Sequence, residues 1–589
     1  MVITGPDGPP PRPRRPAVPA GVSSAVLPAL SLALAWAGLA ALAWLALSAG
    51  APPSTPALWA TTPPAAGAIA AAWLVGARAA LLLVASCRPR HPSLGSRARE
   101  ARPDLDSVVA LLCPTADDFR PDVVRRSMRQ SHGRLRTVIL DDSRTGAARA
   151  AVDAFAASCA PGAVEVVRRA DRRGFKAGNL NNYLSHHADG VDAVVILDAD
   201  QEIGPDFVRT ALRHLRAYHG VAVVQGEIRS RRGGTRFVRD FRGMFDAHLR
   251  AVSAGRSALG IATFAGRGAL LDVGALRAAG GFPEVVAEDA ALTLELAGRG
   301  QTVRYVPDLV SVEDAPTDYA AFTTQLGKFT EGAMQLLGRS GGLLFDPRLH
   351  PARRLDVFVD LASPLVGAAL TVTLFAFGLA AAAGGAGPAP GHAPGLPVPL
   401  GVSLGILGAV PLLPEALRLI QTRDRLEGRT PGRTQGRTPG WSPGRSPGRS
   451  PGWSPGWSPG WSPGRSSVAT MGGSVVGSVL AAISFLMRGA MLYASVAVVA
   501  LRAVLRVAAG NGARFVVTPK ENAEPGLRPS LRRRRPELAA ASVALVTAVL
   551  LTGTVAPAGI FCTVAVTAVG YSWLGGRPVR RRPARRRPV

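Results

Sequence analysis

Ala193-Val-Val-Ile-Leu-Asp198-Ala-Asp200 is the stretch that decides the fold of this chain. Its opening run of apolar, mainly β-branched residues is typical of a strand buried on both faces of a sheet. Two carboxylates follow at once, and in an open α/β sheet ligands bind beyond the carboxyl ends of the strands. Two acids so close repel each other unless a cation lies between them. We therefore predict a Mg²⁺ or Mn²⁺ ion there, carrying a phosphate-rich ligand. For this stretch alone, the alternative is a strand that ends in an Asx turn.

Short apolar runs recur on both sides of this strand and alternate with helix-like stretches. Strands that alternate with helices at this spacing predict a mostly parallel sheet with crossover helices. We assign residues 105–340 to one α/β domain, which is large enough to bury its own core. The expected strands lie at residues 107–112, 135–140, 164–167, 191–197 and 221–224.

The composition indicates that this domain is joined to membrane segments. The chain has 589 residues, a formal net charge of +28 and 47% hydrophobic residues, which favours apolar spans flanked by basic loops. Nowhere do lysines and arginines interleave with aromatic residues in a module that would bind nucleic acid, so no nucleic-acid partner is expected. The four cysteines have no paired spacing, which indicates neither a disulfide framework nor a zinc site.

Six apolar segments approach the roughly 20 residues that a transmembrane helix needs. For the first of them a signal peptide is the alternative, but the run is longer than the apolar core of one. Basic flanking residues place the α/β domain and the C-terminal tail in the cytoplasm. We expect a multi-pass protein of the bacterial cytoplasmic (inner or plasma) membrane. The six segments are residues 24–50, 65–85, 355–383, 396–413, 538–556 and 558–575.

Two other regions have a distinct composition. A four-residue repeat of the form Gly-Arg/Trp-Ser/Thr-Pro fills residues 428–467, and its prolines and glycines predict a flexible linker. Arginines interrupt the apolar residues 475–506, which favours an interfacial or re-entrant helix. The predicted order is a disordered N-terminus (1–22), a transmembrane hairpin (23–87), the α/β domain (105–340), a second hairpin (355–420), the linker (428–467), an interfacial helix with a loop (475–535), a third hairpin (538–576) and a basic tail (577–589).

Acidic residues recur where strands of the α/β domain are expected to end. Asp141 and Asp142 follow one strand, and Glu288-Asp289 begins a helix-like stretch after Gly-Gly-Phe-Pro. Between these lies Lys176-Ala-Gly-Asn-Leu-Asn181, whose lysine and amide side chains suit a phosphate. Taken singly, each motif is explained equally well as a helix cap, a turn or a solvated lysine. Their order within one α/β domain is the informative feature.

Together these motifs resemble the family 2 glycosyltransferases of GT-A fold, in the membrane-embedded branch of cellulose synthase-like polysaccharide synthases. The resemblance covers residues 105–332 and the flanking hairpins. Lys176-Ala-Gly-Asn-Leu-Asn181 is similar to the KAGNLN segment of the family, and Asp198-Ala-Asp200 to its DxD motif. Glu288-Asp289 resembles the end of the TED motif, with Ala287 in place of the threonine.

The resemblance implies a role for each acid. Asp141 or Asp142 would hold the uracil and ribose of a UDP-sugar, with Lys176 near the diphosphate. Asp198 and Asp200 would position the nucleotide and a divalent metal, Mg²⁺ or Mn²⁺, that offsets charge on the departing nucleotide.

Catalysis by attack from the far side of the sugar is also implied. Asp289 would be the general base that takes a proton from the acceptor hydroxyl. Inversion of the anomeric carbon would turn an α-linked donor into a β-linkage. Residues 264–269 occupy the place of the strand-loop that borders the acceptor.

Two later motifs complete the resemblance. Gln325-Leu-Gly-Lys328-Phe329 stands where the family has QxxRW. Lysine keeps the charge of the arginine but loses its bidentate fork, while phenylalanine keeps a ring face for the acceptor sugar. An ordinary amphipathic helix at the membrane surface is the alternative. Phe515-Val-Val-Thr518-Pro-Lys520 resembles the FxVTxK gating loop that closes over bound nucleotide.

The resemblance therefore implies an inverting transferase that moves a sugar from a nucleotide sugar to a growing β-linked polysaccharide, with export through its own helices. Its expected partners are the nucleotide sugar, a polysaccharide or lipid acceptor and the bilayer. Two alternatives stay open: a non-processive transferase that glycosylates a lipid carrier, and a catalytically inactive scaffold.

Overall fold

The computed structural model describes residues 55–87, 104–231, 234–339, 346–383, 492, 497–510, 527–553, 555–575 and 577. Within them, an eight-stranded sheet has the order β3-β2-β1-β4-β7-β6-β8-β5. Its strands are β1 (Val109–Thr115), β2 (Leu135–Asp141), β3 (Val164–Val167), β4 (Ala193–Ile196), β5 (Glu202–Ile203), β6 (Val221–Ser230), β7 (Ala269–Asp272) and β8 (Thr302–Glu313).

The strand β4 lies at the centre of the sheet, between β1 and β7, and every residue in it is buried. Side chains on its two faces enter two different cores, with Val194 and Ile196 in one and Ala193 and Val195 in the other. A polar residue on either face would lose its hydration without a partner. The prediction of a strand buried on both faces is confirmed.

Helices cover both faces of the sheet, as the α/β prediction requires. Leucines and a tyrosine of α7 (Phe175–His186) pack on one face with α10 (Val273–Ala279) and α11 (Glu288–Gly298). Apolar residues of α5 (Pro121–Ser127), α6 (Gly146–Ala157) and α8 (Phe207–Ala217) pack on the other. The α/β fold class is therefore confirmed.

The sheet is mixed, which refines the prediction of a mostly parallel one. β4 pairs antiparallel with β7, β6 pairs antiparallel with β7, and β5 pairs antiparallel with β8. The sequence did not lead us to expect β5, β7 or β8. β7 is only four residues long and has no β-branched side chain, so its strand conformation depends on the neighbouring strands.

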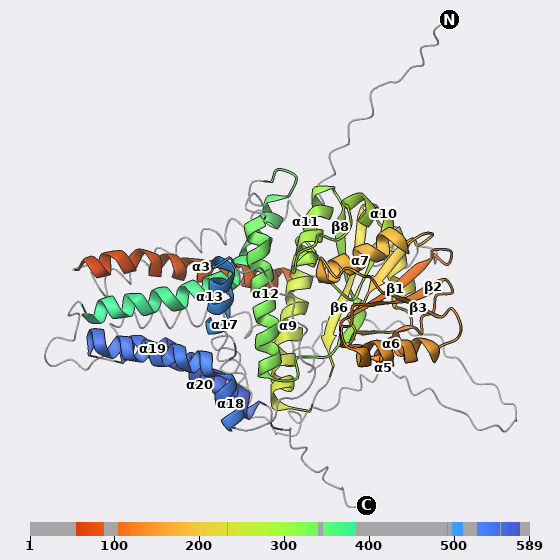
Figure 1. Ribbon diagram of the computed structural model, residues 1–589. Coiled ribbons are helices and arrows are strands. Elements are labelled where there is room, and N and C mark those ends of the chain that lie inside the picture. The colour runs from red at the N-terminus through yellow and green to blue at the C-terminus, as the bar shows by residue number, and fades with distance from the viewer. Residues whose placement is uncertain are drawn as a thin grey trace, which may run out of the picture.

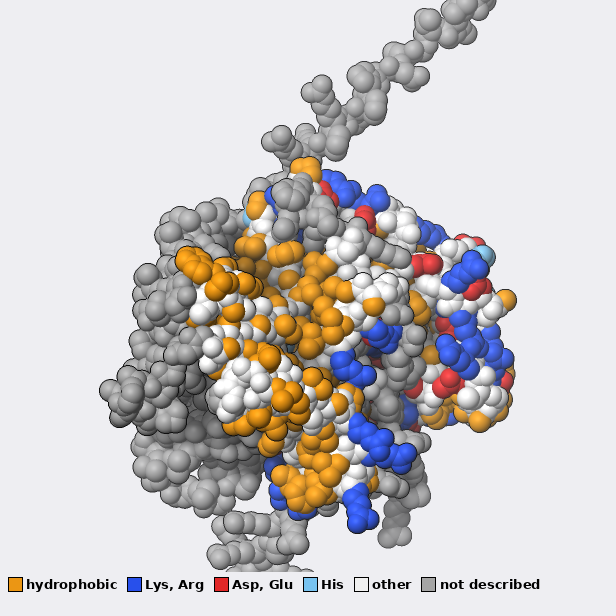
Figure 2. All heavy atoms as spheres, turned by 60° about the vertical axis from the view of Figure 1, so that its left-hand side comes forward, with side chains coloured by type: hydrophobic (Ala, Val, Ile, Leu, Met, Phe, Trp, Pro, Cys, Tyr) orange, Lys and Arg blue, Asp and Glu red, His pale blue; other side chains and the backbone are white. Residues whose placement is uncertain are grey.

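Among the described residues, three helices are long and apolar enough to cross a membrane: α3 (Pro56–Ser86), α13 (Pro351–Ala383) and α19 (Arg535–Thr552). A shorter apolar helix, α20 (Gly559–Leu574), packs against α19. Figure 1 shows α3, α13 and α19 projecting together from one side of the molecule, with α9 (Arg236–Ala258) and α12 (Tyr319–Arg339) between them and the sheet. Apolar side chains dominate this part of the surface in Figure 2, with basic side chains at its edge.

These helices coincide with the expected spans 65–85, 355–383, 538–556 and 558–575. The expected spans 24–50 and 396–413, the N-terminus 1–22 and the linker 428–467 lie outside the described residues. Of the expected interfacial region, the structure describes α17 (Ala497–Ala508) and α18 (Leu527–Arg533), and α17 packs against α12 and α13.

The α/β domain and the apolar helices meet at α9 in a close, charged contact. A Cβ atom on Gly255 would lie 2.1 Å from the carbonyl oxygen of Leu82 in α3, so only glycine fits there. Next to it, Arg256 binds Asp356 and Asp360 of α13, and Arg78 of α3 binds the same two carboxylates. This ring of ion pairs joins the domain to two of the candidate membrane helices.

Candidate functional site

Two cationic side chains converge on Asp198, the first acid after β4. The Lys176 Nζ donates to Asp198 Oδ1 at 2.5 Å and to the carbonyl oxygen of Gly266 at 3.0 Å. The Arg267 Nε lies 3.5 Å from Asp198 Oδ2. Burial alone would raise the pKa of Asp198, but the charges of Lys176 and Arg267 outweigh it and hold the pKa at about 2. Asp198 is therefore a carboxylate with a cation on each side.

The backbone before α7 explains why Lys176 reaches Asp198. Gly174 and Phe175 both have positive φ angles, 72° and 53°, so the chain turns sharply as it enters the helix. A Cβ atom on Gly178 would lie 2.1 Å from the carbonyl oxygen of Arg173, which leaves room only for glycine. Asn181 binds the backbone N–H and C=O of Phe282 with its side-chain amide. Residues 176–181 therefore hold the turn before α7 and the loop at Phe282 in place, and they also position Lys176.

The second acid of the pair, Asp200, is 6% exposed. Its Oδ2 accepts a hydrogen bond of 3.0 Å from the backbone N–H of Asp314. This contact joins the end of β4 to the residue that follows β8. Asp198 therefore contacts cationic side chains, whereas Asp200 accepts from a backbone N–H.

A second pair of acids, Glu288 and Asp289, begins α11. Asp289 Oδ1 accepts a hydrogen bond of 2.8 Å from the N–H of Ala290, and a Cβ atom on Gly266 would lie 3.5 Å from Asp289 Oδ2. Burial and then the charge of Asp289 raise the pKa of Glu288 to about 7, and burial also raises the pKa of Asp289. The pair therefore holds its protons more tightly than ordinary carboxyl groups, and Asp289 lies near Gly266, whose carbonyl oxygen Lys176 binds.

Asp141 and Asp142, at the end of β2, are both bound by arginines. Arg168 donates to Asp141 at 2.7 Å, and Arg169 donates to both oxygens of Asp142 at 3.0 and 2.7 Å. Burial would raise the pKa of Asp141, but hydrogen bonds from Ser143 and Arg168 lower it. Strand register places the ends of β2, β1 and β4 along one edge of the sheet, so these acids share that edge with Asp198.

The residues predicted on α12 lie beside this site. The pKa of Lys328 is lowered by burial, although the charges of Asp198 and Glu288 partly offset that effect. Gln325 lies about one turn earlier and is half-buried, and Phe329 is 47% exposed. The gating-like residues Phe515, Thr518 and Lys520 lie outside the described residues.

The sequence placed residues 264–269 beside the acceptor but assigned no role of its own to Arg267, and none to Glu313. Arg267 donates to both carboxylate oxygens of Glu313, which ends β8. Gln225 of β6 holds the Arg267 loop, because its side chain accepts from Ala265 N–H and donates to the carbonyl oxygens of Arg267 and Gly268. The only signal in the sequence is the pattern Gly-Arg-Gly. Its partner Glu313 is 46 residues away.

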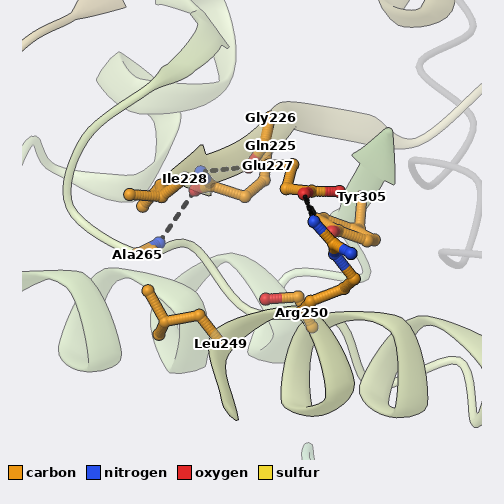
Figure 3. A pocket seen from close by; sticks show the side chains of 9 residues that line it. Gln225, Gly226, Glu227, Ile228, Leu249, Arg250, Ala265 and Tyr305 are labelled. Carbon is orange, nitrogen blue, oxygen red and sulfur yellow. Dashed lines mark hydrogen bonds and ion pairs between the residues drawn. The ribbon is translucent and has the colours of Figure 1, made fainter. Parts of the chain in front are cut away.

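A small pocket lies behind this loop (Figure 3). It is lined by Gln225, Glu227, Arg250, Ala265 and Tyr305 among others. Arg250 donates two hydrogen bonds to the buried Glu227. Among the contacts that the structure describes, this second arginine–glutamate pair makes none to Asp198.

The acids of the site fit a divalent cation. The described residues hold no cluster of three or more His, Cys, Asp or Glu side chains that could bind a metal ion, so the candidate donors are Asp198 and Asp200. Mg²⁺ is commonly held by one or two carboxylates together with substrate phosphates and water. When all are ionised, the five acids Asp198, Asp200, Glu288, Asp289 and Glu313 exceed the three cations Lys176, Arg267 and Lys328 by two charges.

The α/β fold and the cations gathered near Asp198 suit an anionic, phosphate-bearing ligand. Residues 193–389 match Glycosyl transferase family group 2. Glucomannan 4-beta-mannosyltransferase 7 of Arabidopsis thaliana is 27% identical over 178 residues, which cover 30% of this chain and 32% of that protein. Glucomannan 4-beta-mannosyltransferase 2 of the same plant is 28% identical over 172 residues, 28% of this chain and 32% of that protein. Over these residues the chain is similar to family 2 glycosyltransferases, the two plant mannosyltransferases among them.

The matched part is limited, since the chain spans about a third of the length of these curated relatives. Two solved structures also align. GalNAc-T7 with UDP, GalNAc and Mn²⁺ aligns with a TM-score of 0.25 and 11% identity, over 36% of this chain and 44% of that one. A mycobacterial protein aligns with a TM-score of 0.24 and 17% identity, over 39% of this chain and 73% of that one.

Proposed function

We propose that this chain is a membrane-embedded inverting glycosyltransferase that transfers a sugar from a nucleotide sugar, UDP-linked in the simplest case, to a growing β-linked polysaccharide. The observation that carries the proposal is the convergence of Lys176 and Arg267 on Asp198, with Asp289 close to Gly266, whose carbonyl oxygen Lys176 binds. Cations there suit a diphosphate, and an acid with a raised pKa beside them suits proton removal from an acceptor.

Each set of residues has a distinct task in this reaction. Asp141 or Asp142 holds the base and ribose, at the edge of the sheet that also carries Asp198. Lys176 and Lys328 bind the diphosphate and stabilise its charge as the bond to the sugar breaks. Asp198 and Asp200 would hold a divalent cation, which would supply further neutralisation of the leaving group.

Asp289 acts as the general base. It takes the proton of the acceptor hydroxyl as the hydroxyl oxygen attacks the anomeric carbon from the face opposite the leaving nucleotide. Burial raises the pKa of Asp289, and repulsion between Asp289 and Glu288 raises that of Glu288, which suits a base that works nearer neutral pH than an ordinary carboxylate. The ring of Phe329, exposed on α12, provides a stacking face for the acceptor sugar.

A Glu288→Gln variant tests the coupling of this pair. The wild-type rate should fall as the pH drops, because burial raises the pKa of Asp289 and its protonation removes the base. Loss of the Glu288 charge removes the repulsion, so the pKa of Asp289 falls and the acid limb of the pH–rate profile should move down by about one pH unit. Glu295→Gln, on the same helix α11, is the control and should leave the profile unchanged. If the acid limb of the pH–rate profile stays at its wild-type position in Glu288→Gln, the coupling between Glu288 and Asp289 is contradicted.

The apolar helices suggest where the reaction takes place. We place the protein in the bacterial cytoplasmic membrane as a multi-pass protein, with the α/β domain in the cytoplasm where nucleotide sugars are made. Residues 515–520 would close over the bound nucleotide, and the product would leave between the membrane helices.

A donor screen tests the proposed function. Purified full-length protein with Mg²⁺ or Mn²⁺ should release nucleoside diphosphate from at least one of UDP-glucose, UDP-N-acetylglucosamine and GDP-mannose. Removal of the metal with EDTA should lower the rate at least about 100-fold, and added Mg²⁺ or Mn²⁺ should restore it. A ladder of products supports polymer synthesis, whereas a single-sugar lipid product supports transfer to a lipid carrier. Absence of turnover with every donor would favour an inactive scaffold.

A further inference from the structure

Arg267 is held rigidly at the centre of the site. It lies between Gly266 and Gly268, whose φ angles are 78° and 60°, so the chain turns on both sides of it. Its Nε and Nη2 donate to the two oxygens of Glu313, and its Nη1 donates to the carbonyl oxygen of Ala265 at 3.2 Å. Gln201 in turn donates to Ser311 at 3.0 Å and to Glu313 at 3.5 Å. The guanidinium plane is therefore set before any ligand arrives.

The same guanidinium keeps donors for a ligand. An arginine has five N–H donors, and the contacts above use three of them. Its Nε lies 3.5 Å from Asp198 Oδ2, while Lys176 binds the other oxygen of that carboxylate. Arg267 therefore lies on the opposite side of Asp198 from Lys176, within reach of a ligand that Asp198 helps to bind.

Stability alone is a poor explanation of this arrangement. A buried ion pair contributes little net stability, because desolvation offsets the attraction. A fork of N–H donors fixed in one plane, by contrast, suits the bidentate binding of phosphate oxygens. Lysine at position 328 provides charge but no such fork, so the site lacks an arginine at the place where the resembling enzymes have one.

We propose that Arg267 binds the diphosphate of the donor and supplies the guanidinium that position 328 lacks. Glu313 and Gln201 are positioning residues that act through Arg267. This inference rests on the proposed function, since it takes the nucleotide sugar as the ligand. Under this proposal the diphosphate is bound by a residue of the loop 264–268, directly before β7, and not by α12 alone.

Nucleotide binding without turnover tests this role. Full-length protein in detergent with Mg²⁺ is titrated with UDP and GDP, and separately with UMP and GMP. Arg267→Met should weaken diphosphate binding about 30-fold and monophosphate binding less than about threefold, because only the diphosphate reaches the guanidinium. Arg267→Lys keeps the charge without the fork and should weaken diphosphate binding about tenfold. Arg267→Lys also guards against a folding defect in Arg267→Met.

Arg250→Met is the matched control. Arg250 also binds a buried glutamate with two hydrogen bonds, and Arg229 remains on Glu227 when Arg250 is lost. Its nucleotide affinities should equal those of wild type. Unchanged diphosphate binding in Arg267→Met, equal losses for diphosphate and monophosphate, or an equal loss in Arg250→Met would each overturn the role of Arg267. A wild-type protein that binds no nucleotide would contradict the proposed function itself.

Discussion

Replacing Asp289 by asparagine should lower the rate of sugar transfer about 1,000-fold while changing nucleotide affinity less than about threefold. The amide is nearly the same size and can still accept the hydrogen bond from Ala290 N–H. It cannot take up the proton of the acceptor hydroxyl, so the loss should appear in kcat. The measurement is the release of nucleoside diphosphate from the best donor of the screen, with binding of the free nucleotide measured in parallel.

The control for this change is Asp272→Asn, which alters the acid at the start of another helix. Asp272 accepts from Ala275 N–H at 2.8 Å and pairs with Ala193, at the opposite end of β4 from Asp198. It should keep the wild-type rate. Normal turnover in Asp289→Asn would exclude Asp289 as the base, and a normal Asp289→Asn combined with an inactive Glu288→Gln would assign that task to Glu288.

Replacing Arg256 by methionine should destabilise the junction between α9 and α13 by about 3 kcal/mol. Arg256 donates to Asp356 at 2.7 Å and to Asp360 at 2.9 Å, and both Arg256 and Asp356 are over nine-tenths buried. Its loss leaves two carboxylates with Arg78 as the remaining partner in this ring. The expected loss of stability lies at the low end of the range for a broken buried ion pair, because the Asp360 side chain is 47% exposed.

The thermal midpoint of the purified protein in detergent measures this change. Arg250→Met, on the same helix α9, should lower stability by less than about 1 kcal/mol, since its side chain is 41% exposed. Arg256 also donates to Thr263, which directly precedes residues 264–268, so Arg256→Met should slow transfer as well. Equal midpoints for Arg256→Met and Arg250→Met would contradict a stabilising role for the ring.

Several parts of the site were readable from local sequence. The apolar run before Asp198 predicted a buried strand because only such a run can occupy the centre of a sheet covered on both faces. Acids after that strand and after β2 could be placed at one edge because parallel strands end together. The close backbone contact at Gly178, by contrast, became evident only in the structure.

The part of the sheet that contains antiparallel pairs, with β5, β7 and β8, could not be predicted from local sequence in this way. β7 has no β-branched side chain, and the Val-rich β8 is interrupted by Pro307-Asp308, a pair typical of a turn. They are strands because β4 and β6 offer them unpaired backbone groups. The loop that carries Arg267 lies directly before β7, so its place in the site depended on a strand that local pattern did not predict.

Local pattern alone determined the central strand, the acids at its end, the order of the motifs and the apolar helices, since each depends on neighbouring residues. Tertiary structure decided which charges meet. Asp200 accepts from a backbone N–H 114 residues away, and Arg78 binds a carboxylate 278 residues away. Such pairs depend on the order of strands and on the packing of α9 against α3 and α13. Local propensity does not determine which residues far apart in the sequence come close in space. Coulomb interactions and hydrogen bonds between such residues form only after the fold has brought them together.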